Sequence, residues 1–200
     1  DVYKRQSGES PKHFQLSSVS GLRKIRLKAN SVETSRIEVG TLRGDLHDLE
    51  TLEVSGNIRT LEVKGCQRRM SIKSNFISNV YDFKTSNCNS LNKIEAVFAQ
   101  DIDLIELDDL PVLTEATFEA PSGCKGSDTY SRCTFHKIAS KQLPAFKGAW
   151  KNCDKITISD CPNLQSLAGL HALPDLGLIQ IKSLPALQSL FPPDSPSLPT

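Results

Sequence analysis

The side chains of this sequence that could do chemistry are mostly carboxylates. They are densest between Lys93 and Lys125, where no other Lys or Arg occurs, and they comprise Glu95, Asp101, Asp103, Glu106, Asp108, Asp109, Glu115 and Glu119. Such a cluster could bind a cation, form an acid and base pair, or attract a basic partner. A calcium-binding solenoid needs glycine-rich turns with spaced Asp, and residues 101–109 contain no Gly. We therefore expect no metal and no other cofactor.

Catalysis has little support in the sequence. The histidines occupy unrelated positions, and no nucleophile elbow, phosphate-binding loop or H-E-x-x-H motif is present. General acid and base catalysis needs two carboxylates in a cleft, in different environments. We expect a protein that is not an enzyme. The alternative is a β-helix enzyme or binding domain acting on carbohydrates, in which Glu62, Asp82 and Glu106 would supply acids on one outer face.

Composition excludes several classes of protein. The 200 residues carry 24 basic and 23 acidic side chains, a net charge of +1, which provides no overall attraction to nucleic acid. No run of 18 apolar residues occurs, so we expect no membrane span. Aromatic residues make up only 6% of the chain, whereas leucine recurs at regular spacing, which indicates a thin, layered core.

An internal repeat supplies the elements that would position these side chains. Residues 156–167 and 179–190 match at seven of twelve positions with an offset of 23 residues. The shared pattern places apolar residues as hydrophobic-x-x-hydrophobic-x-hydrophobic-x-x-(Leu/Cys/Ile). Further copies begin at Ile58, Ile102, Tyr130 and Cys153, and weaker copies include the pairs Ile37 and Val39, and Tyr81 and Phe83.

The repeat predicts stacked parallel strands. A short strand that returns every 20–28 residues stacks on its predecessor and forms a β-rich solenoid with little helix. A second, out-of-phase series runs from Leu22 through Ile94-x-Ala96 to Ala116-x-Phe118, which predicts two strands per turn in the first part of the chain. After residue 140 the segments 142–146 and 167–173 are predicted to form turns or a short helical turn.

The repeats resemble those of leucine-rich repeat proteins. The run Ile156-Thr-Ile-Ser-Asp-Cys-Pro-Asn-Leu-Gln-Ser-Leu167 is similar to the irregular repeats of plant immune-receptor solenoids. The run from Phe146 to Ile158 is similar to the 23-residue BspA-type repeats of microbial surface proteins. The resemblance implies a binding scaffold whose exposed strand positions contact a partner, and it implies no chemistry. A right-handed β-helix and a receptor L-type domain stay open as alternatives.

The outward positions of these strands form the predicted binding surface. If the apolar residues point inward, the residues between them form one outward column of Glu38, Glu62, Asp82, Glu106, Thr134, Thr157 and Gln180. The neighbouring column contains Gly40, Lys64, Lys84, Asp108, His136, Ser159 and Lys182. Four successive acids about 4.8 Å apart repel one another unless Lys side chains or a cationic ligand neutralise them. A solvated face with local ion pairs and a recognition surface for a basic or polar partner both fit this pattern.

The six cysteines form no C-x-x-C pair, so a zinc site is not predicted. Cys66, Cys133, Cys153 and Cys161 occupy inward positions of the repeat, which favours buried free thiols. Disulfide pairing in an oxidising compartment stays open, with Cys124 and Cys133 as the best local candidates.

We divide the chain into three parts. Residues 1–6 are expected to be a non-native leader, because the chain starts at Asp1 and its first residues resemble translated adaptor sequence. Residues 7–190 form the solenoid, and residues 191–200 form a Pro-rich linker or truncated edge. The predicted function is non-catalytic recognition of a protein partner, possibly a basic one. A carbohydrate partner is the alternative, and localisation is left unassigned.

Overall fold

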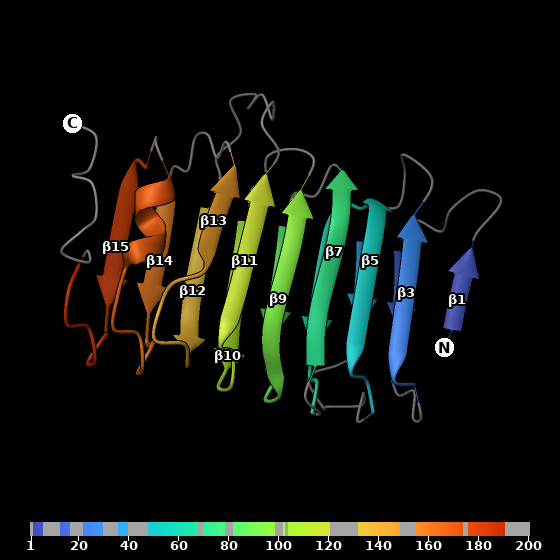
Figure 1. Ribbon diagram of the computed structural model, residues 1–200, viewed down its shortest axis with the longest axis horizontal. Coiled ribbons are helices and arrows are strands. Elements are labelled where there is room, and N and C mark those ends of the chain that lie inside the picture. Colours follow the sequence, from blue (N-terminus) through green and yellow to red (C-terminus); the bar gives the residue numbers. More distant parts are fainter. Residues whose placement is uncertain are drawn as a thin grey trace.

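In the computed structural model the chain forms a β-solenoid whose successive strands stack into two facing parallel sheets (Figure 1). Sheet A contains, in spatial order, β1 (Val2–Arg5), β3 (Lys24–Ala29), β5 (Thr51–Asn57), β7 (Met70–Ser78), β9 (Leu91–Phe98), β11 (Glu115–Ala120) and β13 (Ala145–Gly148). Sheet B contains β2 (His13–Leu16), β4 (Arg36–Val39), β6 (Thr60–Lys64), β8 (Asp82–Ser86), β10 (Leu104–Leu110), β12 (Arg132–Ile138), β14 (Lys155–Ser159) and β15 (Leu178–Lys182). The predicted solenoid of parallel strands is confirmed.

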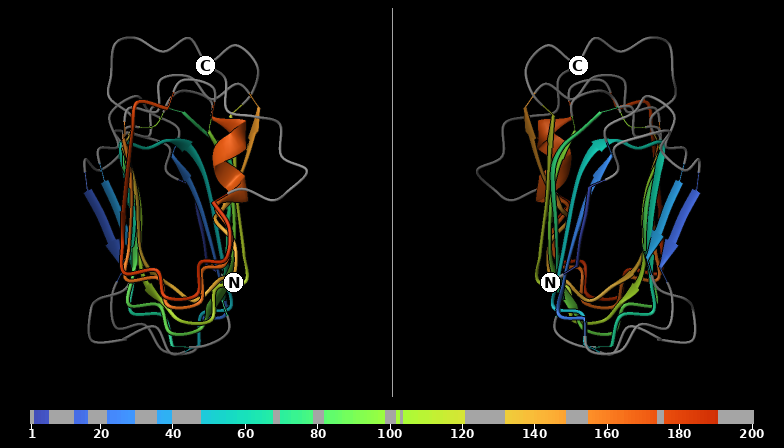
Figure 2. Two further views of the ribbon diagram at one scale, coloured as in Figure 1. Left: turned by 90° about the vertical axis from the view of Figure 1, so that its left-hand side faces the viewer. Right: turned by 90° about the vertical axis from the view of Figure 1, so that its right-hand side faces the viewer.

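The structure describes residues 2–5, 13–16, 22–29, 36–39, 48–67, 70–78, 82–98, 102, 104–120, 132–148, 155–173 and 176–190. Along the coil axis the two sheets are the two long walls of a flattened tube (Figure 2). In sheet B the length of one turn varies from 22 residues, where Leu61 lies opposite Phe83, to 28 residues, where Ile105 lies opposite Cys133. This range agrees with the predicted spacing.

A residue with a left-handed backbone at or near the end of the sheet B strands explains the spacing of the repeat. From β6 onward these residues are Gly65, Asn87, Asp109, Lys137, Asp160 and Ser183, with φ angles of 64, 52, 49, 53, 53 and 55°. Gly, Asn and Asp tolerate this conformation better than other residues do. It turns the chain so that the next side chain points into the coil, where Cys66, Cys88, Leu110, Ile138 and Cys161 are buried.

The strand β8 differs from the predicted alignment by two residues. The register pairs Leu61 with Phe83 and Val63 with Thr85, so the inward pair is Phe83 and Thr85. Tyr81 and Phe83 had been predicted at these positions because the repeat pattern demands apolar residues. Thr85 is instead fully buried, with its Oγ1 atom making no hydrogen bond. The last inward position of this repeat is the buried Cys88.

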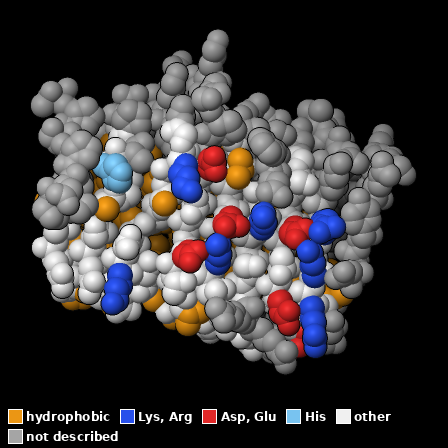
Figure 3. Space-filling model, viewed as in Figure 1, with side chains coloured by type: hydrophobic (Ala, Val, Ile, Leu, Met, Phe, Trp, Pro, Cys, Tyr) orange, Lys and Arg blue, Asp and Glu red, His pale blue; other side chains and the backbone are white. Residues whose placement is uncertain are grey.

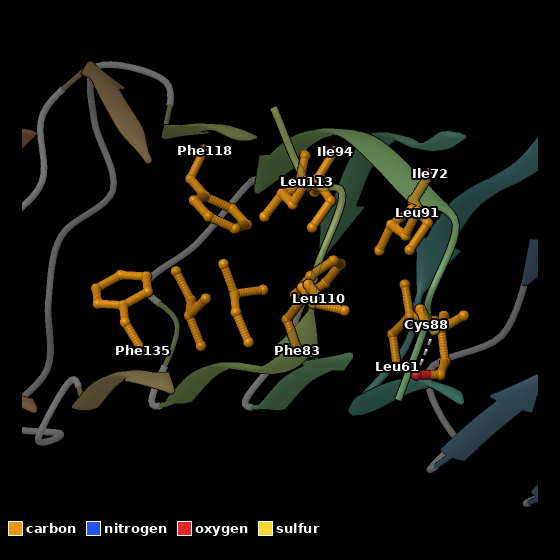
Figure 4. Close-up of a cluster of buried hydrophobic side chains, with 14 of the residues drawn as sticks. Leu61, Ile72, Phe83, Cys88, Leu91, Ile94, Leu110, Leu113, Phe118 and Phe135 are labelled. Atoms are coloured by element: carbon orange, nitrogen blue, oxygen red, sulfur yellow. Dashed lines mark hydrogen bonds between the residues drawn. The ribbon is translucent and has the colours of Figure 1, made fainter. Parts of the chain in front are cut away.

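The core lies between the two sheets and contains aliphatic side chains at both ends of a central aromatic cluster. Phe83 of sheet B contacts Phe98 and Phe118 of sheet A, with ring centroids 6.1 and 5.7 Å apart (Figure 4). Phe135 of sheet B contacts Phe146 of sheet A, with centroids 6.3 Å apart. The aromatic rings therefore join the two walls, and each pair adds about 0.5–1.5 kcal/mol beyond the apolar area that it buries.

The two-strand turns extend further along the chain than the sequence indicated. Within residues 142–146, expected to form a turn, Ala145 and Phe146 belong to strand β13, because Phe146 packs inward against Phe118 and Phe135. The short helical turn expected at residues 167–173 is confirmed by the 3₁₀ helix η1 (Ala168–Ala172). Val2–Arg5, which had been assigned to a leader, form β1 and pair with β3. The Pro-rich residues 191–200 lie outside the described residues.

Candidate functional site

The predicted binding residues lie on the outer face of sheet B, and the strand register fixes their order. One outward column consists of Gln15, Glu38, Glu62, Lys84, Glu106, Thr134, Thr157 and Gln180. The next column consists of Lys64, Ser86, Asp108, His136, Ser159 and Lys182. We call the surface formed by these two columns the sheet B face.

The register corrects one residue in each predicted column. Lys84 lies in the column of Glu62 and Glu106, where Asp82 had been placed, and Ser86 lies where Lys84 had been placed. Asp82 instead pairs with Thr60 and Leu104, two residues away. The error follows from Thr85, because a buried polar side chain hid the true alignment of β8. The predicted run of four successive acids is therefore wrong.

Ion pairs neutralise the first part of the sheet B face. The Lys64 ammonium lies 2.5 Å from a carboxylate oxygen of Glu62, which is only 8% exposed. The Lys84 ammonium lies 3.7 Å from a carboxylate oxygen of Asp82. The nearly buried carboxylate of Glu62 is tolerated because the Lys64 ammonium contacts it. The acids of β6 and β8 are thus largely occupied within the molecule.

The second part of the face contains a chain of three titratable side chains. His136 Nδ1 lies 2.7 Å from an oxygen of Asp108 on β10, and His136 Nε2 lies 3.1 Å from an oxygen of Asp160 after β14. The hydrogen bond from His136 holds the pKa of Asp160 below its ordinary value, with a smaller contribution from Ser183. Both carboxylates accept a hydrogen bond at once only when the imidazole carries two protons. Glu106 and Thr134 flank this chain in the neighbouring column.

The sequence predicted Asp108 and His136 in the same outward column, but Asp160 was not predicted to lie beside them. Asp160 follows the predicted strand and was not assigned to either column. Its left-handed backbone, with φ of 53°, is the local feature that accompanies its contact with His136. One sequence signal could have identified Asp160. It directly follows Ser159, the last outward position of its strand, and it precedes the repeat residue Leu164 by four positions. Thr134, Thr157 and Gln180 continue the first column as neutral, adjacent side chains.

The outer face of sheet A carries basic side chains that are paired with carboxylates. Both Lys24 and Arg26 contact Glu53, at 2.6 Å each, and Arg23 lies 4.0 Å from Glu50. The hydrogen bonds from Arg26 and Lys24 lower the pKa of Glu53. Lys93 contacts Glu95 and Glu115, at 3.0 Å each. Among the described residues, positive and negative side chains alternate across this face (Figure 3).

The four cysteines that the structure describes belong to the core. Cys66, Cys88, Cys133 and Cys161 are buried free thiols, which confirms the prediction for three of the four inward cysteines. Cys124 and Cys153 lie outside the described residues. Among the residues that the structure describes, no group of three or more His, Cys, Asp or Glu side chains could hold a metal ion.

The described part of the chain contains no helix with the length and apolar composition needed to cross a membrane. Comparisons of the chain with protein-family models, with curated proteins and with solved structures gave no match.

Proposed function

We propose that this solenoid is a non-catalytic recognition module and that a protein partner binds the sheet B face. The observation that supports the proposal is a contrast between the two sides of sheet B. Inward positions repeat the same kind of residue, as in Ile105, Phe135 and Ile158. The outward column from Lys64 to Lys182 contains four residue types in six strands. A face whose chemistry changes at each step can discriminate between partners, whereas uniform columns would serve packing alone.

The stiffness of the face favours recognition as well. The interior strands of sheet B are hydrogen-bonded to a neighbour on each side, so their outward side chains start from fixed backbone positions. Side chains on regular strands are placed more accurately than side chains on loops. Binding then costs little conformational entropy in the scaffold.

The charges indicate a basic partner. Glu106, Asp108 and Asp160 lie around His136 in the second part of the face, beyond the ion-paired acids of β6 and β8. A cationic side chain of a partner could contact Glu106 without breaking the bonds of His136. The leucine-rich repeat affiliation is part of the proposal, because the repeats of that family bind partners through the same exposed strand positions.

The carbohydrate-active alternative has less support, because Asp82 does not lie in the column of Glu62 and Glu106. Lys84 lies between Glu62 and Glu106 in the column, and Glu62 is already paired with Lys64. General acid and base catalysis requires two carboxylates that face one substrate. We therefore keep recognition as the proposed function.

Charge reversal on one face and not the other tests the proposal. The double variant Glu106→Lys/Asp108→Lys changes the sheet B face, and Glu95→Lys/Glu119→Lys changes sheet A by the same charge. A partner captured by the wild-type protein is purified, and its affinity for each variant is measured by calorimetry. We expect a loss of at least about tenfold for the sheet B variant, which corresponds to about 1.4 kcal/mol, and little change for the control. Equal affinities for the two variants would refute the proposed face.

A further inference from the structure

His136 on β12 connects three successive turns of sheet B through its two ring nitrogens. His136 Nδ1 lies 2.7 Å from an oxygen of Asp108, which precedes it by 28 residues, and Nε2 lies 3.1 Å from an oxygen of Asp160, which follows it by 24 residues. The strand register explains this arrangement, because His136 lies opposite Asp108 on β10 and opposite Ser159 on β14, which Asp160 directly follows. One imidazole ring therefore bridges two carboxylates along the axis of the coil. We call Asp108, His136 and Asp160 the histidine cluster.

The turn that contains β15 holds Asp160 in place. Asp160 N–H donates to Lys182 C=O at 3.1 Å, and the Ser183 hydroxyl group donates a hydrogen bond to the Asp160 carboxylate. The side chains of Asp108, His136 and Asp160 are 32, 33 and 44% exposed. The histidine cluster is thus fixed by bonds between turns, and both solvent and a partner can reach it.

The number of protons on His136 decides how many hydrogen bonds the histidine cluster contains. An imidazolium donates from both ring nitrogens, whereas a neutral imidazole donates from one and carries a lone pair on the other. Losing a proton therefore removes one of the two hydrogen bonds and leaves a lone pair facing a carboxylate. We expect the 2.7 Å hydrogen bond to Asp108 to be the one that remains, because Asp160 keeps a second donor in Ser183.

The same proton changes the charge of the sheet B face. Two carboxylates and an imidazolium together carry one negative charge, and with a neutral imidazole they carry two. Histidine is the side chain whose charge ordinarily changes between about pH 5 and 8. His136 is the only histidine on β10, β12, β14 and β15. Besides the histidine cluster, the charged residues of these four strands are Glu106, Asp109, Arg132, Lys137, Lys155 and Lys182.

We propose that the proton on His136 controls how tightly the sheet B face binds a basic partner. While the imidazole is protonated, its two N–H groups occupy both carboxylates of the histidine cluster. Once the proton has left, the Asp160 carboxylate and the Nε2 lone pair are neighbouring acceptors, and an ammonium or guanidinium group of the partner donates to both. The affinity for a basic partner therefore rises with pH. This regulation rests on the proposed function, because it requires that the partner on this face is basic.

The peptide acetyl-tetra-arginine amide tests the regulation without the partner. Both of its ends are capped and arginine stays protonated, so the charge of the peptide does not change with pH. We expect at least about threefold tighter binding at about pH 7.5 than at about pH 5.5, the effect of one added charge about 6 Å away in an exposed position. Calorimetry at low ionic strength measures both affinities. Equal affinities at the two pH values would overturn the proposal.

A single substitution assigns the pH dependence to His136. His136→Gln keeps a hydrogen-bond donor and has no proton to lose, so the pH dependence of peptide binding should disappear. His171→Gln, which changes η1 and leaves the sheet B face intact, is the matched control and should bind like the wild type. A pH dependence that persists in His136→Gln would contradict the assignment.

If His136→Gln fails to fold, NMR of the wild-type protein gives the answer. Binding and protonation affect each other by the same factor, so saturating peptide should lower the pH midpoint of the His136 ring signals by about 0.5 unit for a threefold preference. The midpoint of the His171 signals should not move. A His136 midpoint that the peptide leaves unchanged would also overturn the proposal.

The captured partner separates this inference from the proposed function. If Glu106→Lys/Asp108→Lys weakens the partner but its wild-type affinity is equal at both pH values, the binding face is supported and the control by His136 is refuted. If the peptide shows the pH dependence but the double variant binds the partner as the wild type does, the control by His136 is supported and the proposed binding face is refuted.

Discussion

Glu62 on β6 lies directly opposite Lys84 on β8, so a basic side chain interrupts the acids in this outward column of the sheet B face. Glu38 precedes Glu62 in the column and Glu106 follows Lys84. The column thus runs acid, acid, base, acid, and Lys64 contacts Glu62 from the neighbouring column. Neighbouring parallel strands are about 4.8 Å apart, so reversing the charge of one side chain changes its electrostatic interaction with the side chains on both neighbouring strands.

Reversing the charge of Lys84 should destabilise the coil. Lys84→Glu places like charges opposite both Glu62 and Glu106, and each such pair costs up to about 1 kcal/mol. We expect the free energy of unfolding in urea to fall by about 1 kcal/mol at low salt, and by less at about 0.5 M salt, where screening is strong. Lys182→Glu, at an exposed position on β15, is the control. A loss that does not depend on salt would show that repulsion is not its cause.

The repeat pattern predicted the solenoid because the core imposes the same requirement on every turn. Inward side chains must be apolar, and the left-handed residue fixes the spacing to the next one, so the periodicity is visible without any tertiary information. The prediction went wrong at β8 because Thr85 fills an apolar position with a hydroxyl group. A pattern based on hydrophobicity instead aligned Tyr81 and Phe83 with the inward positions, and this alignment wrongly placed Asp82 in the acidic column.

The misleading residue should also be a weak point of the core. Thr85 is fully buried and its hydroxyl group has no hydrogen-bond partner. Thr85→Val keeps the shape and removes the cost of burying that hydroxyl, so we expect a gain of about 1 kcal/mol in the free energy of unfolding. Thr157→Val, at an outward position, should change it by less than about 0.5 kcal/mol. Urea titration measures both, and a destabilised Thr85→Val would mean that the hydroxyl is satisfied in solution.

The sequence predicted which residues lie on the sheet B face better than it predicted which of their side chains are in contact. Asp108 and His136 share a column because strands repeat, but Asp160 reaches His136 from beyond the strand, where the repeat pattern ends. A cleft beside Ala116, lined by residues 113–117 and 138–145, was equally hard to predict, because one Ala in an apolar column is compatible with close packing. Whether a neighbouring turn fills the space depends on the path of residues 138–145, which the repeat does not determine.

Removing His136 should release Asp160. The hydrogen bond from His136 lowers the pKa of Asp160, so its contribution to stability is present above the unfolded-state pKa and is lost as the pH falls through the lower folded-state value. In His136→Ala we expect the pKa of Asp160 to rise toward its ordinary value, as measured by carboxyl ¹³C titration. Glu53, whose pKa is lowered by Arg26 and Lys24, should be unchanged in the same spectra. An unchanged Asp160 would show that the contact with His136 is not formed in solution.

The buried thiols should be chemically inert in the folded protein. Cys88 Sγ lies 3.4 Å from Ser86 C=O and 3.8 Å from Val63 C=O, and Cys161 Sγ lies 3.2 Å from Ser159 C=O and 3.6 Å from Phe135 C=O. Each thiol therefore has one acceptor in its own turn and one in the previous turn (Figure 4 shows Cys88). Burial raises the pKa of Cys161, and the contact with Cys88 together with burial raises the pKa of Cys66. The thiolate is the reactive form, so both effects slow alkylation.

Iodoacetamide labelling measures this inertness site by site. We expect Cys66, Cys88 and Cys161 to react at least about tenfold more slowly in the native protein than in urea, when peptides are quantified by mass spectrometry. Raising the pH should accelerate labelling of Cys66 and Cys161 in urea first, because their pKa values are raised in the folded protein and both thiols ionise earlier in urea. Labelling of Cys161 at the same rate in both states would place it outside the core and would contradict its role as the last inward residue of its repeat.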